Sequence, residues 1–206
     1  MGTLSYNRRV SQLRAICAVH ALRPDEGTVG VTAIDKRPVS GAVKVGPFGV
    51  RTDIQADRKH HGGLEAAIYA YSEADAAWWG EQLGRELAPG WFGENFRVEG
   101  IDVSGAHVGE RWRVGSGEGA VELEVTSPRR PCQTFARWVG SQFEGAHERG
   151  WVKRFQQAER PGAYLRVITN GRVSAGDAIE VTFRPDDAPT IAEVFRVGEL
   201  SRAIRS

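Results

Sequence analysis

Gly109-Glu110-Arg111-Trp112-Arg113-Val114 is the stretch that decides the fold class. Its glycine favours a turn, and the alternation that follows places Trp112 and Val114 on one face of a strand, with the arginines on the other. Gly176-Asp177-Ala178-Ile179-Glu180-Val181 repeats this order of turn, acid and strand, and Gly41-Ala42-Val43-Lys44-Val45 is a looser copy. Strands entered from tight turns suit a closed or nearly closed β-barrel, because closure removes exposed strand edges.

Strands are predicted at nine places, bounded by glycine and other turn-forming residues. The 25 glycines are spread over the whole chain, which fits many short strands joined by tight turns. In one of these strands Val121, Leu123 and Val125 alternate with glutamates, as expected where one face is buried. The predicted ranges are Leu13–Val19, Gly30–Ile34, Val43–Val45, Ala67–Tyr71, Asn95–Val98, Arg111–Val114, Val121–Thr126, Ala163–Ile168 and Ala178–Phe183.

Helices are expected at only a few places around these strands. Ser72 caps a helix with Asp75 three residues on, a weaker form of the capping box. Behind this cap Trp79, Leu83 and Leu87 recur at four-residue spacing, and the following proline and glycine stop the run. Further helices are predicted over Thr134–Val139 and Glu148–Ala158, and from Ile191 behind a capping box of Thr190 and Glu193.

Composition narrows the class of protein. At 206 residues the chain can form one domain with a substantial core and room for a small appendage. Its 27 basic and 26 acidic residues nearly balance, so no nucleic acid is expected as a partner. No segment approaches the roughly 20 apolar residues of a membrane span, and the apolar stretch near the N-terminus is too short for a signal peptide. A cytoplasmic protein without membrane contact is therefore expected.

The two cysteines have different surroundings, which argues against a disulfide framework. Cys17 lies in an apolar run and is expected in the core. Cys132 follows Ser127-Pro128-Arg129-Arg130-Pro131, a turn held by two prolines. A thiol beside two permanent positive charges is expected to ionise readily, and a thiolate ligates soft metals or attacks electrophiles. The alternative is that Cys132 is a small buried residue.

A second group of polar residues lies between Asp53 and Gly63. Histidine titrates near neutral pH and binds metals or anions, but His60 and His61 are adjacent and would point to opposite sides of an extended chain. They are therefore not expected to bind the same metal. Gly62 and its neighbour would let backbone amides approach a ligand closely. An ordinary polar loop is the alternative interpretation.

Two further positions carry polar groups that suit ligand binding. Asn95 offers both a donor and an acceptor, which suits it to fixing a loop or to reading the edge of a heterocycle. Lys36 lies in a basic extended segment. A structural turn and a solvated surface are the alternatives for these two. No Walker loop, nucleophile elbow or dinucleotide fingerprint accompanies them.

In this order, the segments resemble the MOSC domain, the C-terminal domain of molybdenum-cofactor sulfurases, and within it the stand-alone bacterial YiiM-type branch. The similarity runs from about residue 15 to residue 183. Its motifs are Lys36-Arg37-Pro38-Val39, Gln55-Ala56-Asp57, His60-His61-Gly62-Gly63, Ala67-Ile68-Tyr69-Ala70-Tyr71, Phe92-Gly93-Glu94-Asn95, Val108-Gly109-Glu110-Arg111, Pro128-Arg129-Arg130-Pro131-Cys132 and Gly162-Ala163-Tyr164-Leu165-Arg166-Val167.

The resemblance implies a mainly β fold with peripheral helices, in which residues 1–183 form a MOSC-type β-barrel. Residues 184–206 would form a short helical appendage, a truncated form of the three-helix region of this branch. It also implies binding of the molybdenum cofactor and reduction of N-hydroxylated substrates, including hydroxylamino-purines and amidoximes. Electrons would come from a separate reductase protein, because no flavin or nicotinamide motif is present. A homodimer is left open.

The resemblance further implies the roles of individual residues. Cys132 would be the molybdenum ligand. Asp53 and His61 would act in catalysis and, together with His60, would supply protons to the leaving hydroxyl. Arg129 or Arg130 would bind the cofactor phosphate. The residues expected to bind the cofactor are Lys36, His60, His61, Gly62, Asn95, Arg129 and Arg130.

Three positions depart from the family pattern. Thr52 stands where glycine is usual, and Ala66 or its neighbour and Thr134 stand where lysines are common. Two fewer cations would weaken anion binding. Two alternatives to the reductase also stay open, because the Cys132 thiol would serve all three: a sulfur carrier with a persulfide on Cys132, and a non-enzymatic module that binds the cofactor.

Overall fold

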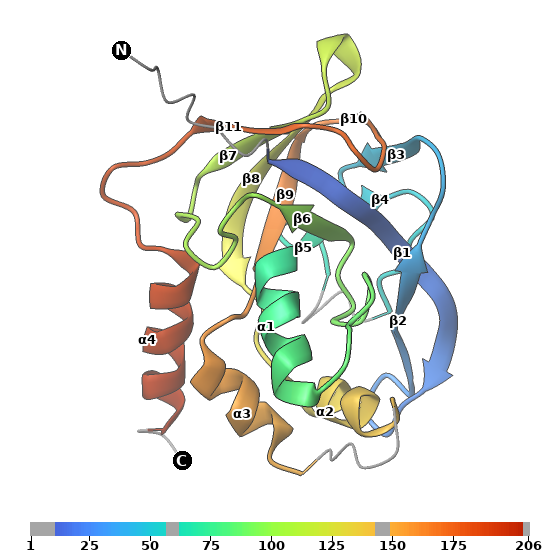
Figure 1. The fold of residues 1–206 in the computed structure, drawn as a ribbon, viewed down its shortest axis with the longest axis vertical. Coiled ribbons are helices and arrows are strands. Elements are labelled where there is room, and N and C mark those ends of the chain that lie inside the picture. The colour runs from blue at the N-terminus through green and yellow to red at the C-terminus, as the bar shows by residue number, and fades with distance from the viewer. Residues whose placement is uncertain (1–10, 57–61, 143–148, 204–206) are drawn as a thin grey trace, which may run out of the picture.

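The structure is a computed structural model that describes residues 11–56, 62–142 and 149–203, with side chains described as far as residue 198. These ranges consist mainly of strands, with a few helices between them and one after the last strand (Figure 1). The strands are β1 (Gln12–Pro24), β2 (Val31–Pro38), β3 (Val43–Gly46), β4 (Gly49–Val50), β5 (Ile68–Ser72), β6 (Phe96–Glu99), β7 (Arg111–Val114), β8 (Val121–Pro128), β9 (Ala163–Thr169), β10 (Gly171–Val173) and β11 (Ile179–Phe183). The α-helices are α1 (Glu73–Leu83), α2 (Gln133–Gly140), α3 (Trp151–Ala158) and α4 (Ile191–Ala203).

The main sheet runs in the order β11-β7-β8-β9-β5-β6-β1-β2, and β10-β3-β4 form a second, smaller sheet. Neighbouring strands pair antiparallel except β5 and β6, which are parallel. The mainly β prediction with peripheral helices is therefore confirmed. Sequence analysis missed β4 and β10, which span two and three residues and are too short to show any alternation.

The main sheet is not closed into a barrel by continuous strand pairing in the part of the chain that the structure describes. The edge strand β11 instead reaches β1 through one bridge, between Gln12 and Ala178. Backbone hydrogen bonds support it, from Leu13 to Asp177 at 2.8 Å and from Ile179 to Ser11 at 2.8 Å. The sheet therefore curls until its edge strand β11 meets β1, the strand beside the opposite edge. It is nearly closed, which agrees with the expectation of a closed or nearly closed barrel, but it is not a complete barrel.

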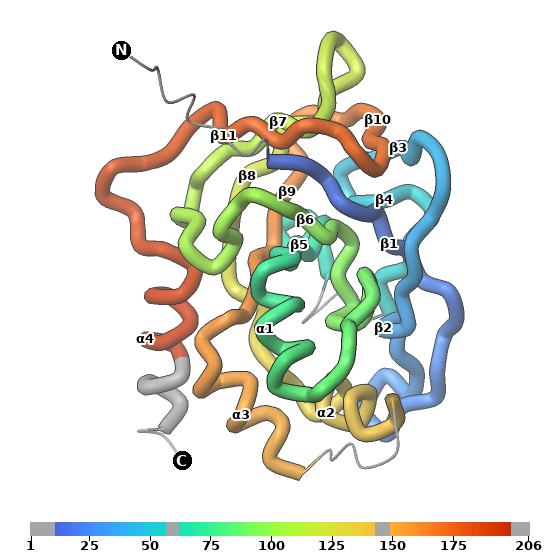
Figure 2. The backbone as a smooth tube through the Cα atoms, viewed as in Figure 1, coloured from blue at the N-terminus to red at the C-terminus, as the bar shows by residue number. Residues whose placement is uncertain are grey.

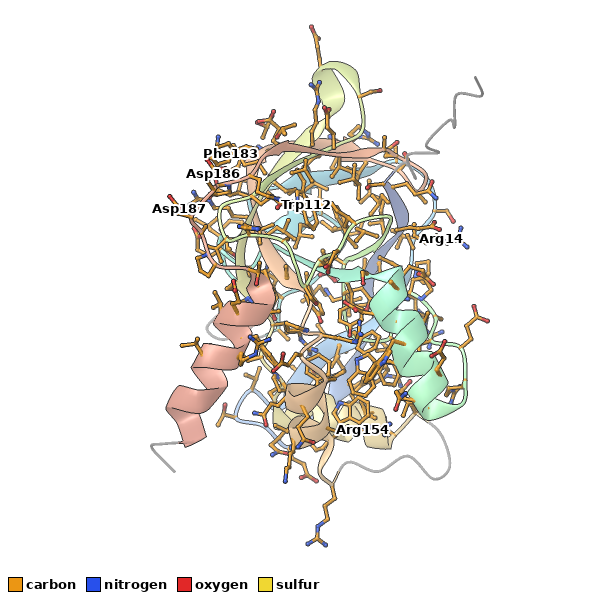
Figure 3. All side chains as sticks on the ribbon, turned by 60° about the vertical axis from the view of Figure 1, so that its left-hand side comes forward. Arg14, Trp112, Arg154, Phe183, Asp186 and Asp187 are labelled. Carbon is orange, nitrogen blue, oxygen red and sulfur yellow. The ribbon has the colours of Figure 1, made fainter. Side chains whose placement is uncertain are left out.

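Two apolar clusters fill the interior. The first lies between the strands and contains Trp112, which is fully buried and donates its indole N–H to Glu110 at 2.7 Å (Figure 3). Its neighbour Val114 is equally buried, while Arg111 on the same strand is exposed, as the alternation predicted. The second cluster is aromatic and contains Trp79 and Phe135, which lie on α1 and α2.

The helices gather at one end of the curled sheet and along its side (Figures 1 and 2). Ser72 caps α1 as predicted, accepting a hydrogen bond from the Asp75 backbone at 3.0 Å. The helix stops at Leu83 rather than running on to Leu87, because Gly84 adopts a left-handed conformation with φ of 64°. Within the described ranges, no helix has the length and apolarity needed to cross a membrane.

The other predicted helices are present with altered bounds. Thr190 and Glu193 form the expected capping box of α4, with the Thr190 amide donating to Glu193 at 2.8 Å. In return, the Glu193 amide donates to the Thr190 hydroxyl at 3.3 Å. α3 begins at Trp151, behind a left-handed Gly150, whereas the predicted start at Glu148 lies outside the described residues.

An ion pair joins α2 to the hairpin between β1 and β2. Arg137 donates to both oxygens of Asp25, at 2.9 Å each, and the Thr134 hydroxyl also donates to Asp25 at 2.9 Å. The Asp25 carboxylate is 8% exposed and the Arg137 guanidinium 24%. The hydrogen bonds from Arg137 hold the pKa of Asp25 below its ordinary value.

We expect Gly49→Ala to destabilise the protein far more than Gly41→Ala. Both glycines have positive φ, so both variants carry left-handed strain of roughly 1–2 kcal/mol. A Cβ at Gly49 would also overlap the carbonyl oxygen of Ala67, whereas a Cβ at Gly41 meets nothing within 4 Å. The clash should add about 1–3 kcal/mol to the loss of unfolding free energy. Urea denaturation of the two variants measures this difference, and equal losses would contradict it.

We expect Asp25→Asn to lower the free energy of unfolding at pH 7 by about 1–3 kcal/mol, because a charge-assisted pair is lost. The folded pKa of Asp25 lies below the unfolded value of 3.8, so the pair's contribution is complete well above pH 3.8. As the pH falls through the folded pKa, the difference between wild type and variant should shrink. Urea titrations from pH 7 downward measure it. Glu159→Gln, which breaks the exposed Arg196 pair, is the control and should cost only about 0–1 kcal/mol.

Candidate functional site

A cavity of about 760 Å³ collects most of the residues that the sequence singled out. Its wall is formed by the hairpin between β1 and β2, the segment that follows β4, the turn between β8 and α2, and one residue of α4. Six predicted site residues line it: Lys36, Asp53, Asn95, Arg129, Arg130 and Cys132. They come from distant parts of the sequence, so the fold assembles this cavity.

The carboxylate of Asp53 organises one side of the cavity. It accepts hydrogen bonds from the Val19 backbone at 2.8 Å, from the Asn95 amide at 2.7 Å, and from the Lys36 ammonium. The side chains of Asp53 and Lys36 are 7% and 10% exposed. A buried carboxylate with three donors is fixed in position, and so are the groups that it holds.

Asn95 connects this network to the sheet. Its side-chain oxygen accepts from the Tyr69 backbone at 3.2 Å, and its amide also donates to the Cys17 carbonyl at 3.3 Å. Its backbone exchanges hydrogen bonds with the same two residues, at 2.8 and 2.6 Å. The amide therefore fixes the junction of β1 and β5 as well as Asp53, so the loop-fixing role proposed from the sequence fits the structure.

The Lys36 ammonium holds its proton less tightly than a solvated lysine does. Burial lowers the pKa of Lys36, while the neighbouring carboxylate of Asp53 opposes this shift. An ammonium whose pKa is lowered releases its proton more readily than a solvated lysine. Lys36 can therefore serve as a proton donor to a ligand in the cavity.

Arg129 carries a buried positive charge on the cavity wall. Its side chain packs on Phe135 and Tyr69, with the guanidinium carbon 4.4 and 5.1 Å from the ring centres. Burial acts to lower the pKa of Arg129, but Tyr69, Tyr164 and Cys132 raise it above its ordinary value. Its Nη1 is buried and has no hydrogen-bond partner among the described residues. A buried guanidinium nitrogen without an acceptor is the kind of group that an anionic ligand satisfies.

Cys132 lies at the start of α2 and is partly exposed. Its backbone carbonyl accepts from Ala136 at 3.1 Å, which makes Cys132 the N-cap residue of this helix. The thiol thus reaches the cavity from a helix N-terminus, and Arg129 is close enough for Cys132 to affect its pKa. Cys17 differs, since it is fully buried and burial raises the pKa of its thiol, so its assignment to the core is confirmed.

A second cavity of about 1000 Å³ adjoins the first. It is lined by the indoles of Trp91 and Trp138 and by the exposed Arg37. Five residues line both cavities: Asp25, Thr32, Ile34, Lys36 and Thr134. Lys36 and the ion-paired Asp25 therefore lie on the wall between them.

Three predicted site residues are not among these six. His60 and His61 fall outside the described residues. Gly62 is described but does not line the cavity, while its neighbour Gly63 donates to the Gln55 side chain at 2.9 Å. Of the departures from the family pattern, Ala66 and Thr134 line the cavity and Thr52 lies in an exposed turn.

Sequence reasoning missed part of the cavity wall. Tyr69 and Tyr164 were identified only as parts of motifs, although their rings lie 5.4 Å apart beside Arg129. Val194 of α4 was assigned to a separate appendage, yet it lines the cavity. The alternation of β5 places Tyr69 on the face opposite Ile68 and Ala70, which belong to the first cluster. No sequence signal indicates where α4 packs.

The two cysteines provide a test of this geometry. In the native protein we expect iodoacetamide to label Cys132, because it is partly exposed at a cavity, and to leave the fully buried Cys17 unlabelled. Peptide mass spectrometry after a timed reaction measures the labelling at each position, and labelling in denaturant provides the full signal for both. Labelling of Cys17 before Cys132 would contradict the described geometry.

Comparison with known proteins identifies a family and several relatives of this chain. A family model for the MOSC domain matches residues 57–180. The uncharacterised protein YflK of Bacillus subtilis (strain 168) is 32% identical over 166 residues, which are 81% of this chain and 70% of YflK. Protein YiiM of Escherichia coli (strain K12) is 28% identical over 170 residues, again 81% of this chain and 70% of the relative.

Solved structures agree with the sequence comparison. The crystal structure of YiiM from Geobacillus stearothermophilus matches with a TM-score of 0.71 and 25% identity, over 93% of this chain and 85% of that chain. YiiM from Escherichia coli shares the fold, with a TM-score of 0.63 over 90% and 76% of the two chains at 22% identity. The chain therefore belongs to the MOSC domain family, which is associated with the molybdenum cofactor.

Proposed function

We propose that this protein binds the molybdenum cofactor in the 760 Å³ cavity and reduces N-hydroxylated compounds, with Cys132 as the protein ligand of the metal. One observation carries the proposal. A thiol, a buried guanidinium with an unsatisfied nitrogen and a buried proton donor line the same cavity. Cys132, Arg129 and Lys36 are these three groups.

The residues present fit such a cofactor. The cavity volume of about 760 Å³ is within the range of small-molecule sites. A thiolate is a soft ligand suited to a metal that is already held by sulfur. The planar guanidinium of Arg129 suits a phosphate, and its buried Nη1 lacks an acceptor among the described residues. Arg130 on the same wall would add a second cation, and Asn95 would contact a heterocycle edge only if its hydrogen bonds rearranged.

When bound, the cofactor would supply the two electrons that reduction of an N–O bond consumes. Those electrons would reach it from a separate reductase protein. The remaining requirement falls on this chain, because cleavage of the N–O bond takes up two protons and releases water. Lys36 holds one of these protons at Nζ, and its lowered pKa favours transfer to the leaving hydroxyl, while the second proton would come from solvent water. The Asp53 carboxylate keeps Nζ in place and stabilises its charge before transfer.

The second cavity supports a path for substrate. It shares Lys36 with the first cavity, so a compound entering beside Trp91 and Trp138 would reach the same proton donor. Indole faces and edges suit a planar substrate. Hydroxylamino-purines and amidoximes, the substrates implied for relatives, include planar N-hydroxylated compounds. His61 as a further proton donor stays a prediction, as does a homodimer.

We expect Cys132→Ser to lose most of the bound molybdenum and of the reductase activity. The variant is expressed in a host that makes the cofactor, its metal content is measured by elemental analysis, and amidoxime reduction is assayed with a chemical electron donor. A hard hydroxyl is a poor substitute for a soft thiolate, so a loss of roughly 100-fold or more in activity is expected. Cys17→Ala is the control, since Cys17 is fully buried and is not among the residues that line the cavity, and it should retain both properties.

The other outcomes separate the alternatives. Full activity in Cys132→Ser would overturn the proposal. A wild-type protein without molybdenum that gains a sulfur adduct on Cys132 after incubation with a cysteine desulfurase would favour the persulfide carrier. Stoichiometric molybdenum without turnover of a panel of N-hydroxylated compounds would favour a cofactor-binding module.

A further inference from the structure

Helix α4 is held firmly against the body of the protein. Ile191 and Phe195 are fully buried, one in each of the two apolar clusters. Arg196 donates to both oxygens of the Glu159 carboxylate, at 3.0 and 2.6 Å, and so connects α4 to the end of α3. Because the helix is anchored at several points, its inner face has a defined position relative to the cavity. Val194 on that face lines the cavity wall.

Gly198 lies four residues, or about one helical turn, beyond Val194 and therefore on the same face of α4. A Cβ built at Gly198 would overlap both terminal nitrogens of Arg130 and would lie 2.5 Å from its Cζ. The guanidinium of Arg130 thus rests directly against the α4 backbone, in space that any side chain at position 198 would occupy. Arg130 itself lines the cavity beside Cys132.

Glycine at this position is not explained by the helix. α4 is helical through Gly198, and glycine is a poor helix former compared with alanine. Its φ is not positive, so backbone conformation does not require glycine either. The steric need comes from Arg130, the residue whose atoms a side chain at 198 would meet.

We propose that Gly198 is a positioning residue for anion binding. It provides the space in which the Arg130 guanidinium lies against α4, and this placement directs Arg130 toward a phosphate-type anion in the cavity. The C-terminal helix then determines the affinity of the site without contacting the ligand. The inference rests on the proposed function, in which that anion is the phosphate of the cofactor.

Gly198→Ala is a sharp test because the obstructed atoms are the far end of a flexible side chain. Arg130 can swing away, so the protein should fold, and the added helix propensity should keep its melting temperature at or above that of the wild type. Val197→Ala is the matched control, as Val197 is the neighbouring residue and is 61% exposed.

Two readouts measure anion binding without activity. The first is the phosphate concentration that strips half of the molybdenum from protein purified from a cofactor-producing host. The second is the apparent affinity of the cofactor-free protein for inorganic pyrophosphate, from its effect on the melting temperature. We expect Gly198→Ala to weaken both by roughly three- to tenfold, and Val197→Ala to leave both unchanged.

Coupling to Arg130 distinguishes positioning from a general structural effect. A lysine at 130 lacks the planar fork that needs the space above Gly198. In an Arg130→Lys background, Gly198→Ala should therefore have no further effect on either readout. Equal losses in both backgrounds, or unchanged pyrophosphate affinity in Gly198→Ala, would overturn the inference. Wild-type protein that binds pyrophosphate but never carries molybdenum would sink the proposed function and leave this inference standing.

Discussion

The site depends on the burial of one carboxylate, that of Asp53. It binds the backbone of β1 through Val19, the ammonium of Lys36 on β2 and the amide of Asn95 before β6. Three strands are thus related to one another around a group that is 7% exposed. Buried ion pairs seldom stabilise a fold more than apolar residues of the same size would. The buried pair of Lys36 and Asp53 at the cavity wall is therefore better explained by the ability of Lys36 to donate a proton to a ligand.

The two charged sides of the cavity differ in how their charge is compensated. Lys36 has a carboxylate within hydrogen-bond range, which fixes its position and supports its charged form. Arg129 has aromatic rings instead, and its Nη1 has no acceptor in the described part of the chain. Aromatic faces attract a cation but leave its hydrogen bonds unmade. A ligand that brings anionic oxygen is therefore favoured beside Arg129 and Cys132, and a proton can be delivered from the Lys36 side.

Much of the fold could be predicted because its strands alternate visibly. The buried Trp112 and the exposed Arg111 follow directly from period-two patterning, and the capping box of α4 follows from Thr190 and Glu193. A closed or nearly closed sheet was expected, but the contact that brings its ends together could not be predicted, because it is a single long-range bridge between Gln12 of β1 and Ala178 before β11. The predicted end of the helix after Ser72 was wrong. Leu87 continues the helical spacing, but the left-handed Gly84 ends the helix at Leu83. Leu87 is buried all the same, beyond the end of the helix.

The polar residues of the cavity could be predicted from the sequence, but the elements that form its walls could not. Cys132 with its arginines and Asp53 stood out by residue type, and the fold brings them together. The position of α4 depends on tertiary packing of Phe195 and on the ion pair of Arg196 with Glu159, neither of which leaves a local pattern. The same limit applies to Thr134, which stands where lysine is common in the family pattern. The Thr134 hydroxyl and the Arg137 guanidinium both bind the Asp25 carboxylate. Thr134 therefore adds no positive charge to the cavity, and the charges of Arg137 and Asp25 compensate each other. An anionic ligand would then depend mainly on the positive charges of Arg129 and Arg130. Its affinity would therefore be more sensitive to the contact between the Arg130 guanidinium and Gly198 of α4.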